Sequence, residues 1–166
     1  MVTRWLQHLF TTPLLLRRRF PALLLDEIET AIRDSEKHHQ GEIRFAIETA
    51  LPFSALWRGV SARQAAVETF SDLRVWDTQD NSGVLIYLLL ADHDLEIVAD
   101  RGIAEKVGQG EWDEIARIME QHFRAGQFRE GALEGIRRVT ALLAAHFPPG
   151  GRNPDELSNK PAIIKR

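Results

Sequence analysis

Alternation of apolar and polar residues marks one strand in the first third of the chain. Residues 42–48 (EIRFAIE) alternate strictly, so one face is apolar and the other is mostly polar. Residues 83–90 form a continuous apolar run of strand length, which is typical of a central strand covered on both faces. A turn at 91–94 separates this run from a short apolar segment at 95–99, which predicts a hairpin. The pattern therefore predicts three strands.

Apolar residues spaced three and four apart predict helices in the remaining segments. A capping box of Ser61 and Gln64 opens the second helix. Between the first strand and this helix, residues 51–60 contain Pro52 and Gly59 and are predicted to form a loop. The predicted helices are one that begins at Pro21 and stops before Gly41, one after Ser61, a short one near Ile103, one at 111–124 and one at 130–146.

The order of these elements predicts an α/β fold. A helix between the first two strands favours a parallel crossover, and the third strand is expected to lie antiparallel beside the second. We therefore expect a three-layer α/β/α sandwich with a small mixed sheet, formed by residues 21–148, with 83–90 as its central strand. Residues 149–166 are rich in Gly, Asn, Pro and Ser and are predicted to form a disordered C-terminal tail.

Residues 1–20 combine apolar residues with a cluster of three arginines and are predicted to form an amphipathic N-terminal arm. Thr12 and Pro13 suit the cap and first turn of a short helix. One interpretation is peripheral contact with an anionic membrane. The other, which we favour, is packing against the arm's own domain. The apolar stretches are too short and too interrupted for a signal peptide or for a membrane-spanning segment.

Composition narrows the class of protein. Hydrophobic residues make up 44% and charged residues 27% of the chain, which are ordinary values for a globular protein. The net charge of −3 provides no general attraction to nucleic acid, so nucleic acid is not an expected partner. The absence of cysteine excludes disulfides, a thiolate nucleophile and cysteine-ligated zinc, and it suits a reducing compartment. We expect a cytoplasmic protein, peripheral at the inner membrane face if the arm contacts lipid.

Oxygen-bearing side chains precede and follow the predicted hairpin. Asp77, Asp80 and Asn81 lie in the loop before the central strand, and Asp100 follows the third strand. These are ligand types that Ca²⁺ or Mg²⁺ prefers, and the sequence predicts a weak cation site where the two segments meet. The alternative interpretation is that the loop residues form a turn and that Asp100 caps the following helix.

A second polar group lies at the corner between the first helix and the first strand. Glu36, His38, His39 and Glu42 could gather around a metal there. Adjacent histidines on a helix end point about 100° apart, and polar residues are ordinary at a helix terminus, so we favour a structural interpretation.

Four segments occur in an order and spacing that resemble the TPM domain family, sometimes labelled TPM phosphatases, over about residues 22–147. They are Gly41 to Ile47, Asn81 to Ile86, Arg101 to Ile103, and Phe123 to Phe128 with Gly131 and Gly135. The resemblance implies an α/β sandwich, divalent-cation binding at strand ends in some members, a proposed acid phosphatase activity in plant chloroplast members, and links to membrane-protein assembly or repair.

The chain also departs from the family pattern. Asn81-Ser82 stands where paired asparagines are usual, Asp100 replaces the first glycine of a glycine-x-glycine turn, and Gln109 replaces an acidic residue. We therefore expect a non-enzymatic binding or accessory module with a protein partner, linked to membrane-protein assembly or maintenance. The alternative is a divalent-metal-dependent acid phosphatase that uses Asp77, Asp80, Asn81 and Asp100.

Overall fold

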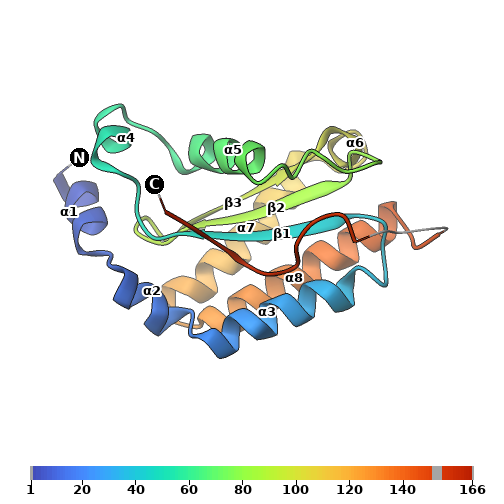
Figure 1. Cartoon of the computed structure of the whole chain (residues 1–166), viewed down its shortest axis with the longest axis horizontal. Helices are drawn as coiled ribbons and strands as arrows, with labels where there is room; N and C mark the ends of the chain where they lie inside the picture. Colours follow the sequence, from blue (N-terminus) through green and yellow to red (C-terminus); the bar gives the residue numbers. More distant parts are fainter. Residues whose placement is uncertain (1, 151–154, 166) are drawn as a thin grey trace.

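The computed structural model describes residues 2–150 and 155–165 of the 166-residue chain. Figure 1 shows a twisted sheet with helices packed on both of its faces. In chain order the elements are α1 (Val2–Phe10), α2 (Pro13–Arg19), α3 (Ala22–Ser35), β1 (Glu42–Glu48), α4 (Phe53–Trp57), α5 (Ala62–Asp72), β2 (Gly83–Leu89), β3 (Asp94–Ala99), α6 (Arg101–Ala104), α7 (Gln109–Arg124), α8 (Phe128–His146) and β4 (Ala162–Ile164).

The sheet of the described chain has four strands in the order β3-β2-β1-β4. β1 and β2 run parallel, with Glu42 opposite Gly83 and Glu48 opposite Leu89. β3 lies antiparallel on the other edge of β2. Every residue of β2 is buried, so the predicted central position of this strand is confirmed.

Helices cover the two faces of the sheet unequally. α3, α7 and α8 lie on one face, and α5 with the short α4 lies on the other (Figure 1). On the first face, Ile43, Phe45 and Ile47 of β1 join a large core with residues of the three long helices. On the second face, Ala46 and Tyr87 belong to a smaller core with residues of α4 and α5. The predicted three-layer α/β/α sandwich with a mixed sheet is confirmed.

Residues 51–60 differ from the prediction of a loop, because they contain α4. Pro52 occupies the N-cap position with φ of −65°, which suits the start of a helix. Ala55 and Leu56 are buried in the smaller core, whereas Phe53 and Trp57 are exposed. A helix of five residues is too short to produce a recognisable apolar period, so the sequence pattern did not reveal it.

The C-terminal segment also differs from the predicted disordered tail. Residues 162–164 form β4, which pairs in parallel with the end of β1. The Arg44 guanidinium donates hydrogen bonds to the carbonyl oxygens of Ser158 and Lys160, and Leu157 is buried. The prediction is therefore corrected for residues 155–165, whereas 151–154 and 166 lie outside the described residues. The prediction rested on the polar composition of the whole segment, which gave no weight to the three consecutive apolar residues 162–164.

The N-terminal arm forms α1 and α2. The Thr12 side chain caps α2 and Pro13 is its first residue, as predicted. Arg4 of α1 forms a salt bridge of 2.9 Å with Asp92, and Leu16 of α2 is part of the large core. The arm thus packs on its own domain. Across the described residues, every helix is too short or too polar to cross a membrane.

Candidate metal centre

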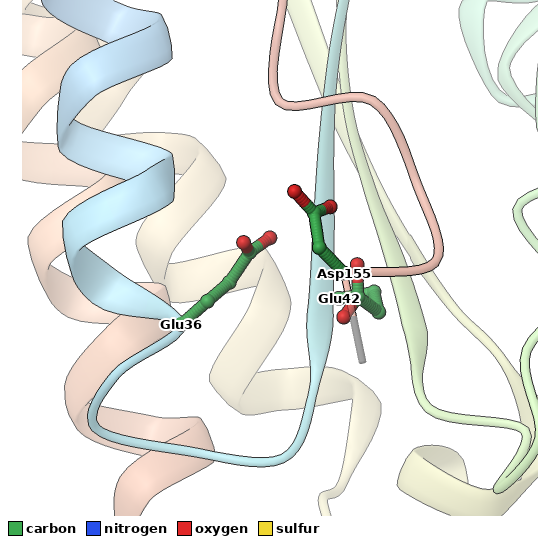
Figure 2. A group of neighbouring side chains, drawn as sticks. All are labelled: Glu36, Glu42 and Asp155. Carbon is green, nitrogen blue, oxygen red and sulfur yellow. The ribbon is translucent and has the colours of Figure 1, made fainter. Parts of the chain in front are cut away.

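Three carboxylates meet at the corner between α3 and β1. Glu36 directly follows α3, Glu42 is the first residue of β1, and Asp155 belongs to the C-terminal segment. Figure 2 shows the three side chains, which come from three separate segments. One oxygen from each lies within 4.8 Å of the others, and no other group of three or more His, Cys, Asp or Glu in the described ranges is so arranged.

Contacts at the end of α3 and at the start of β1 fix the corner that carries Glu36 and Glu42. At the end of α3, the Ser35 hydroxyl donates a hydrogen bond of 2.7 Å to the carbonyl oxygen of Ile32. Gly41 lies against α8, where an added Cβ would come within 2.9 Å of the Leu143 side chain. The Glu42 N–H then donates to the Ser82 carbonyl oxygen at 3.0 Å, which starts β1 beside β2. Both carboxylates therefore project from regular, packed elements.

The C-terminal segment completes the cluster. The Leu157 N–H donates a hydrogen bond of 3.1 Å to Oε2 of Glu42. Asn159 donates from its amide to Oδ2 of Asp155 at 3.4 Å. Pairing of β4 with β1 holds the segment that follows. Two acids of the site thus lie within residues 22–147, the part of the chain that resembles a known family, and the third lies outside it.

Glu42 is the most unusual member of the cluster. Its relative exposure is 1%, although it is an acid. Its Oε1 atom is buried and makes no hydrogen bond of ordinary geometry with the described residues. A buried carboxylate oxygen without a donor is costly, because it loses water and gains no replacement. A bound cation would supply the missing partner.

Crowding and burial change the protonation of both glutamates. The pKa of Glu36 is raised from 4.5 to about 8, first by burial and then by the charges of Glu42 and Asp155, against an opposing hydrogen bond from Asn159. Burial likewise raises the pKa of Glu42 from 4.5 to about 7, opposed by the backbone N–H groups of Leu157 and Glu156. A divalent cation would oppose the mutual repulsion and favour the ionised forms.

A cleft of about 440 Å³ opens at the cluster. Its lining includes two basic residues that form their salt bridges with other acids, because Arg33 pairs with Glu29 at 2.7 Å and Lys37 pairs with Asp34 at 2.6 Å. His39 also lines the cleft. Burial lowers the pKa of its ring to about 4, so it is neutral at pH 7. The positively charged side chains that line the cleft are therefore paired with acids outside the cluster.

The donor set fits a hard divalent cation. Its three close ligand groups are all carboxylates, and oxygen donors suit Ca²⁺ and Mg²⁺, whereas zinc sites are usually built from Cys and His. Three carboxylates do not fill a coordination shell of six or more positions, so water would occupy the rest.

The loop that was predicted to bind a cation does meet the start of α6. Gly102 packs so closely on it that an added Cβ would lie 2.6 Å from the carbonyl oxygen of Asp80 and 2.8 Å from that of Asn81. The Asn81 side-chain oxygen accepts a hydrogen bond of 3.1 Å from Nε of Arg101. The expected approach of the two segments is therefore found.

The carboxylates of that loop do not gather. Asp77 and Asp80 are exposed, and Asn81 adopts a positive φ of 51° that is typical of a turn. Asp100 caps α6 by accepting a hydrogen bond of 2.7 Å from the Arg101 N–H, and its buried Oδ2 makes no hydrogen bond with the residues described. These three acids form no group with oxygens within 4.8 Å in the described chain. Cation binding there stays a prediction.

The sequence analysis grouped two members of the acidic cluster but favoured a structural interpretation of them, and it did not include the third member. Glu36 and Glu42 were considered together with His38 and His39, but His38 is exposed and the histidines are not in the group. Asp155 lies in the segment predicted to be disordered. Glu42 opens a strand in which six of seven residues are buried, but this burial depends on tertiary packing and is not visible in the sequence.

Comparisons with known proteins agree with the fold. The family model for the TPM domain matches residues 23–142. The solution structure of BA42 protein from the psychrophilic bacterium Bizionia argentinensis has 31% sequence identity and a TM-score of 0.76, covering 86% of this chain and 94% of that one.

A second solved structure is similar in fold alone. The N-terminal domain of a protein from P. gingivalis has 18% identity and a TM-score of 0.62, with coverage of 79% of this chain and 82% of that domain. None of the curated proteins compared with the chain matches its sequence.

Proposed function

The chain belongs to the TPM domain family, and we propose that it is a non-enzymatic module that binds Ca²⁺ or Mg²⁺ through Glu36, Glu42 and Asp155. The observation that carries this proposal is Oε1 of Glu42, which is buried beside two further carboxylates and accepts no hydrogen bond of ordinary geometry from residues 2–150 and 155–165. Three neighbouring acids repel one another, and a divalent cation both removes the repulsion and fills the position that a donor would occupy.

Cation binding would couple the C-terminal segment to the domain. Asp155 precedes β4, whereas Glu36 directly follows α3 and Glu42 begins β1, so one cation would bridge both parts. The domain would bind its cation most tightly when this segment is docked. Its accessory role, by the family resemblance, would lie in membrane-protein assembly or maintenance, through a protein partner.

Isothermal titration calorimetry of the full chain with CaCl₂ and MgCl₂ at pH 7.5 tests the proposal. Wild type should bind one cation, with a dissociation constant on the order of 10⁻⁴ M, because only three carboxylates contribute. Glu42→Gln and Asp155→Asn each remove one negative charge with little change of shape. Each should weaken binding at least about tenfold, which corresponds to about 1.4 kcal/mol.

Matched controls separate this site from the loop before β2. Asp80→Asn and Asp100→Asn also remove one carboxylate each and should leave the affinity unchanged. Loss of binding in these variants, with normal binding in Glu42→Gln, would move the site to the loop. Absence of any heat in wild type, at protein concentrations suited to a weak site, would refute cation binding at both places.

Acid phosphatase activity is the alternative for the same cleft. Hydrolysis of p-nitrophenyl phosphate at acidic and neutral pH, with Mg²⁺ or Ca²⁺ and with chelator, distinguishes the two functions. We expect no hydrolysis above a denatured-protein control. Cation-dependent hydrolysis that disappears in Glu42→Gln would overturn the non-enzymatic part of the proposal and keep the metal site.

A further inference from the structure

α1 presents its apolar side to solvent and its polar side to the protein. His8 is 6% exposed, whereas Leu9 and Phe10 are 72% and 71% exposed. Leu6 is also exposed. An amphipathic helix that belongs only to its own domain buries the apolar side. In α1 this orientation is reversed.

Specific polar contacts hold α1 in this orientation. Nδ1 of His8 accepts a hydrogen bond of 3.0 Å from the Leu51 N–H, and Nε2 lies 2.9 Å from Asp92. Arg4 contacts the same carboxylate at 2.9 Å and donates to the Val60 carbonyl oxygen. Because these partners lie on the domain, the outward direction of Leu9 and Phe10 is built into the fold.

α4 extends the same apolar surface. Trp5 of α1 packs edge-on against Phe53 and Trp57, with ring centroids 4.7 Å and 6.2 Å apart. Phe53 and Trp57 nevertheless remain 68% and 75% exposed. α1 and α4 lie at the same end of the molecule, opposite α6 (Figure 1). We refer to the exposed residues Leu6, Leu9, Phe10, Phe53 and Trp57 as the α1–α4 surface.

The two segments that carry the α1–α4 surface are basic in sequence, although two of their arginines, Arg4 and Arg63, pair with Asp92 in the turn before β3 and with Glu96 of β3. Residues 1–25 and 49–67 contain six arginines and no acidic residue, so the remaining 15 Lys and Arg face all 24 Asp and Glu. The other segments therefore carry a charge of −9, although the whole chain carries −3. Arg17, Arg18 and Arg58 are exposed, and Arg58 directly follows Trp57.

We infer that the α1–α4 surface docks on the surface of an anionic lipid bilayer. Exposed Trp and Phe next to exposed Arg are the combination that inserts at the headgroup boundary of such a membrane. The nine residues of α1 span only about 14 Å, so the helix would lie in the interface plane. A second copy of the chain is disfavoured as occupant, because two basic surfaces would repel each other.

Co-sedimentation with vesicles tests this inference on the full chain. Chelator is present throughout, so that the result does not depend on the acidic cluster. Wild type should bind vesicles of equal parts phosphatidylglycerol and phosphatidylcholine, and binding to pure phosphatidylcholine should be at least about tenfold weaker. High salt should weaken the binding, because it screens the arginines.

Two variants locate the contact. Trp57→Ala and Arg58→Glu change exposed side chains, so folding is preserved, and each should lower vesicle partitioning at least about fivefold. Trp76→Ala is the matched control, because Trp76 is also exposed but lies in the segment before β2, which packs against Gly102 of α6. It should bind like wild type.

The other outcomes are decisive. Equal partitioning of Trp57→Ala and Trp76→Ala would overturn the inference. So would failure of wild type to bind anionic vesicles. If wild type instead sediments as a dimer that Trp57→Ala dissociates, the surface joins two copies of the chain. If it binds only an acidic protein, the occupant is a protein and not a bilayer.

Discussion

The corner that holds Glu36 and Glu42 and the loop that holds Asp77 and Asp80 are both acidic, but they use their carboxylates differently. At the loop, Asp100 has one buried oxygen that makes no hydrogen bond within the part of the chain that the structure describes, as Glu42 has at the corner. The difference lies in the neighbours. Asp77 and Asp80 are exposed to water, whereas Glu36 and Asp155 bring their oxygens to within 4.8 Å of Glu42.

The two regions have similar acidic composition. They differ because several carboxylates lie close to one buried oxygen at the corner and not at the loop. A turn or a cap satisfies acidic side chains one at a time with N–H groups and water. At the corner, elements from three parts of the chain force acids together, and burial raises the pKa of both glutamates. The corner is unfavourable without a cation, and the loop is not.

The largest expected effect concerns stability without metal. The pKa of Glu42 rises from 4.5 in the unfolded chain to about 7 in the fold, which corresponds to a cost of up to about 3 kcal/mol once the group is ionised. Between these two values the unfolded chain releases the proton and the folded chain keeps it. The stability of wild type relative to Glu42→Gln therefore falls as pH rises from 4.5 to 7.

Denaturant unfolding in chelator at pH 5 and pH 8 measures this difference. Glu42→Gln should be more stable than wild type at pH 8, and the gap should narrow at pH 5. His39, which affects pH dependence in the opposite direction, is present in both proteins and cancels. Addition of Ca²⁺ should close the gap at pH 8. An equal gap at both pH values in chelator would mean that Glu42 is not destabilising when ionised.

The second effect concerns the loop, where close packing and not metal binding is expected to dominate. Gly102→Ala would place a Cβ at 2.6 Å from the Asp80 backbone, so the loop or α6 must shift. We expect destabilisation of about 2 kcal/mol, within the range for overpacking, and no change in cation affinity. Urea unfolding with and without Ca²⁺ measures both quantities.

Gly110→Ala is the control for this substitution. Gly110 lies in the first turn of α7, where an added Cβ meets nothing within 4 Å. Alanine should therefore stabilise the protein by up to about 1 kcal/mol through its higher helix propensity. Similar stability of the two variants would show that the contact between the loop and α6 is loose.

The fold could be predicted from the sequence because its main elements are long and periodic. β2 has a continuous apolar run, and the two C-terminal helices show apolar spacing over four turns or more. α4 and β4 were missed because five and three residues do not produce a period. Whether these two short segments form a helix and a strand depends on their contacts with distant parts of the chain, which the local sequence does not reveal.

The site could be predicted only in part, because its members are distant in sequence. Asp77, Asp80 and Asn81 are close together in the chain, and this proximity suggested a site where the structure has a turn. Glu42 and Asp155 are more than a hundred positions apart and meet because the C-terminal segment runs along β1, where the Leu157 N–H binds Glu42 and β4 pairs with the end of the strand. Both residues can be read from the sequence, but the position of the C-terminal segment beside β1 cannot, because it depends on tertiary packing.

The smallest expected effect tests whether Asp155 belongs to the cluster. Its charge raises the pKa of both Glu36 and Glu42, so Asp155→Asn should lower both pKa values, by less than about one unit because Asp155 is exposed to water. Carboxyl carbon NMR during a pH titration in chelator follows each glutamate directly. Asp34→Asn is the matched control, since Asp34 is an exposed acid two residues from Glu36 that pairs with Lys37. It should shift neither glutamate by a comparable amount. If Asp155→Asn behaves like this control, the C-terminal segment does not supply charge to the corner, and a cation would have only Glu36 and Glu42 to bind.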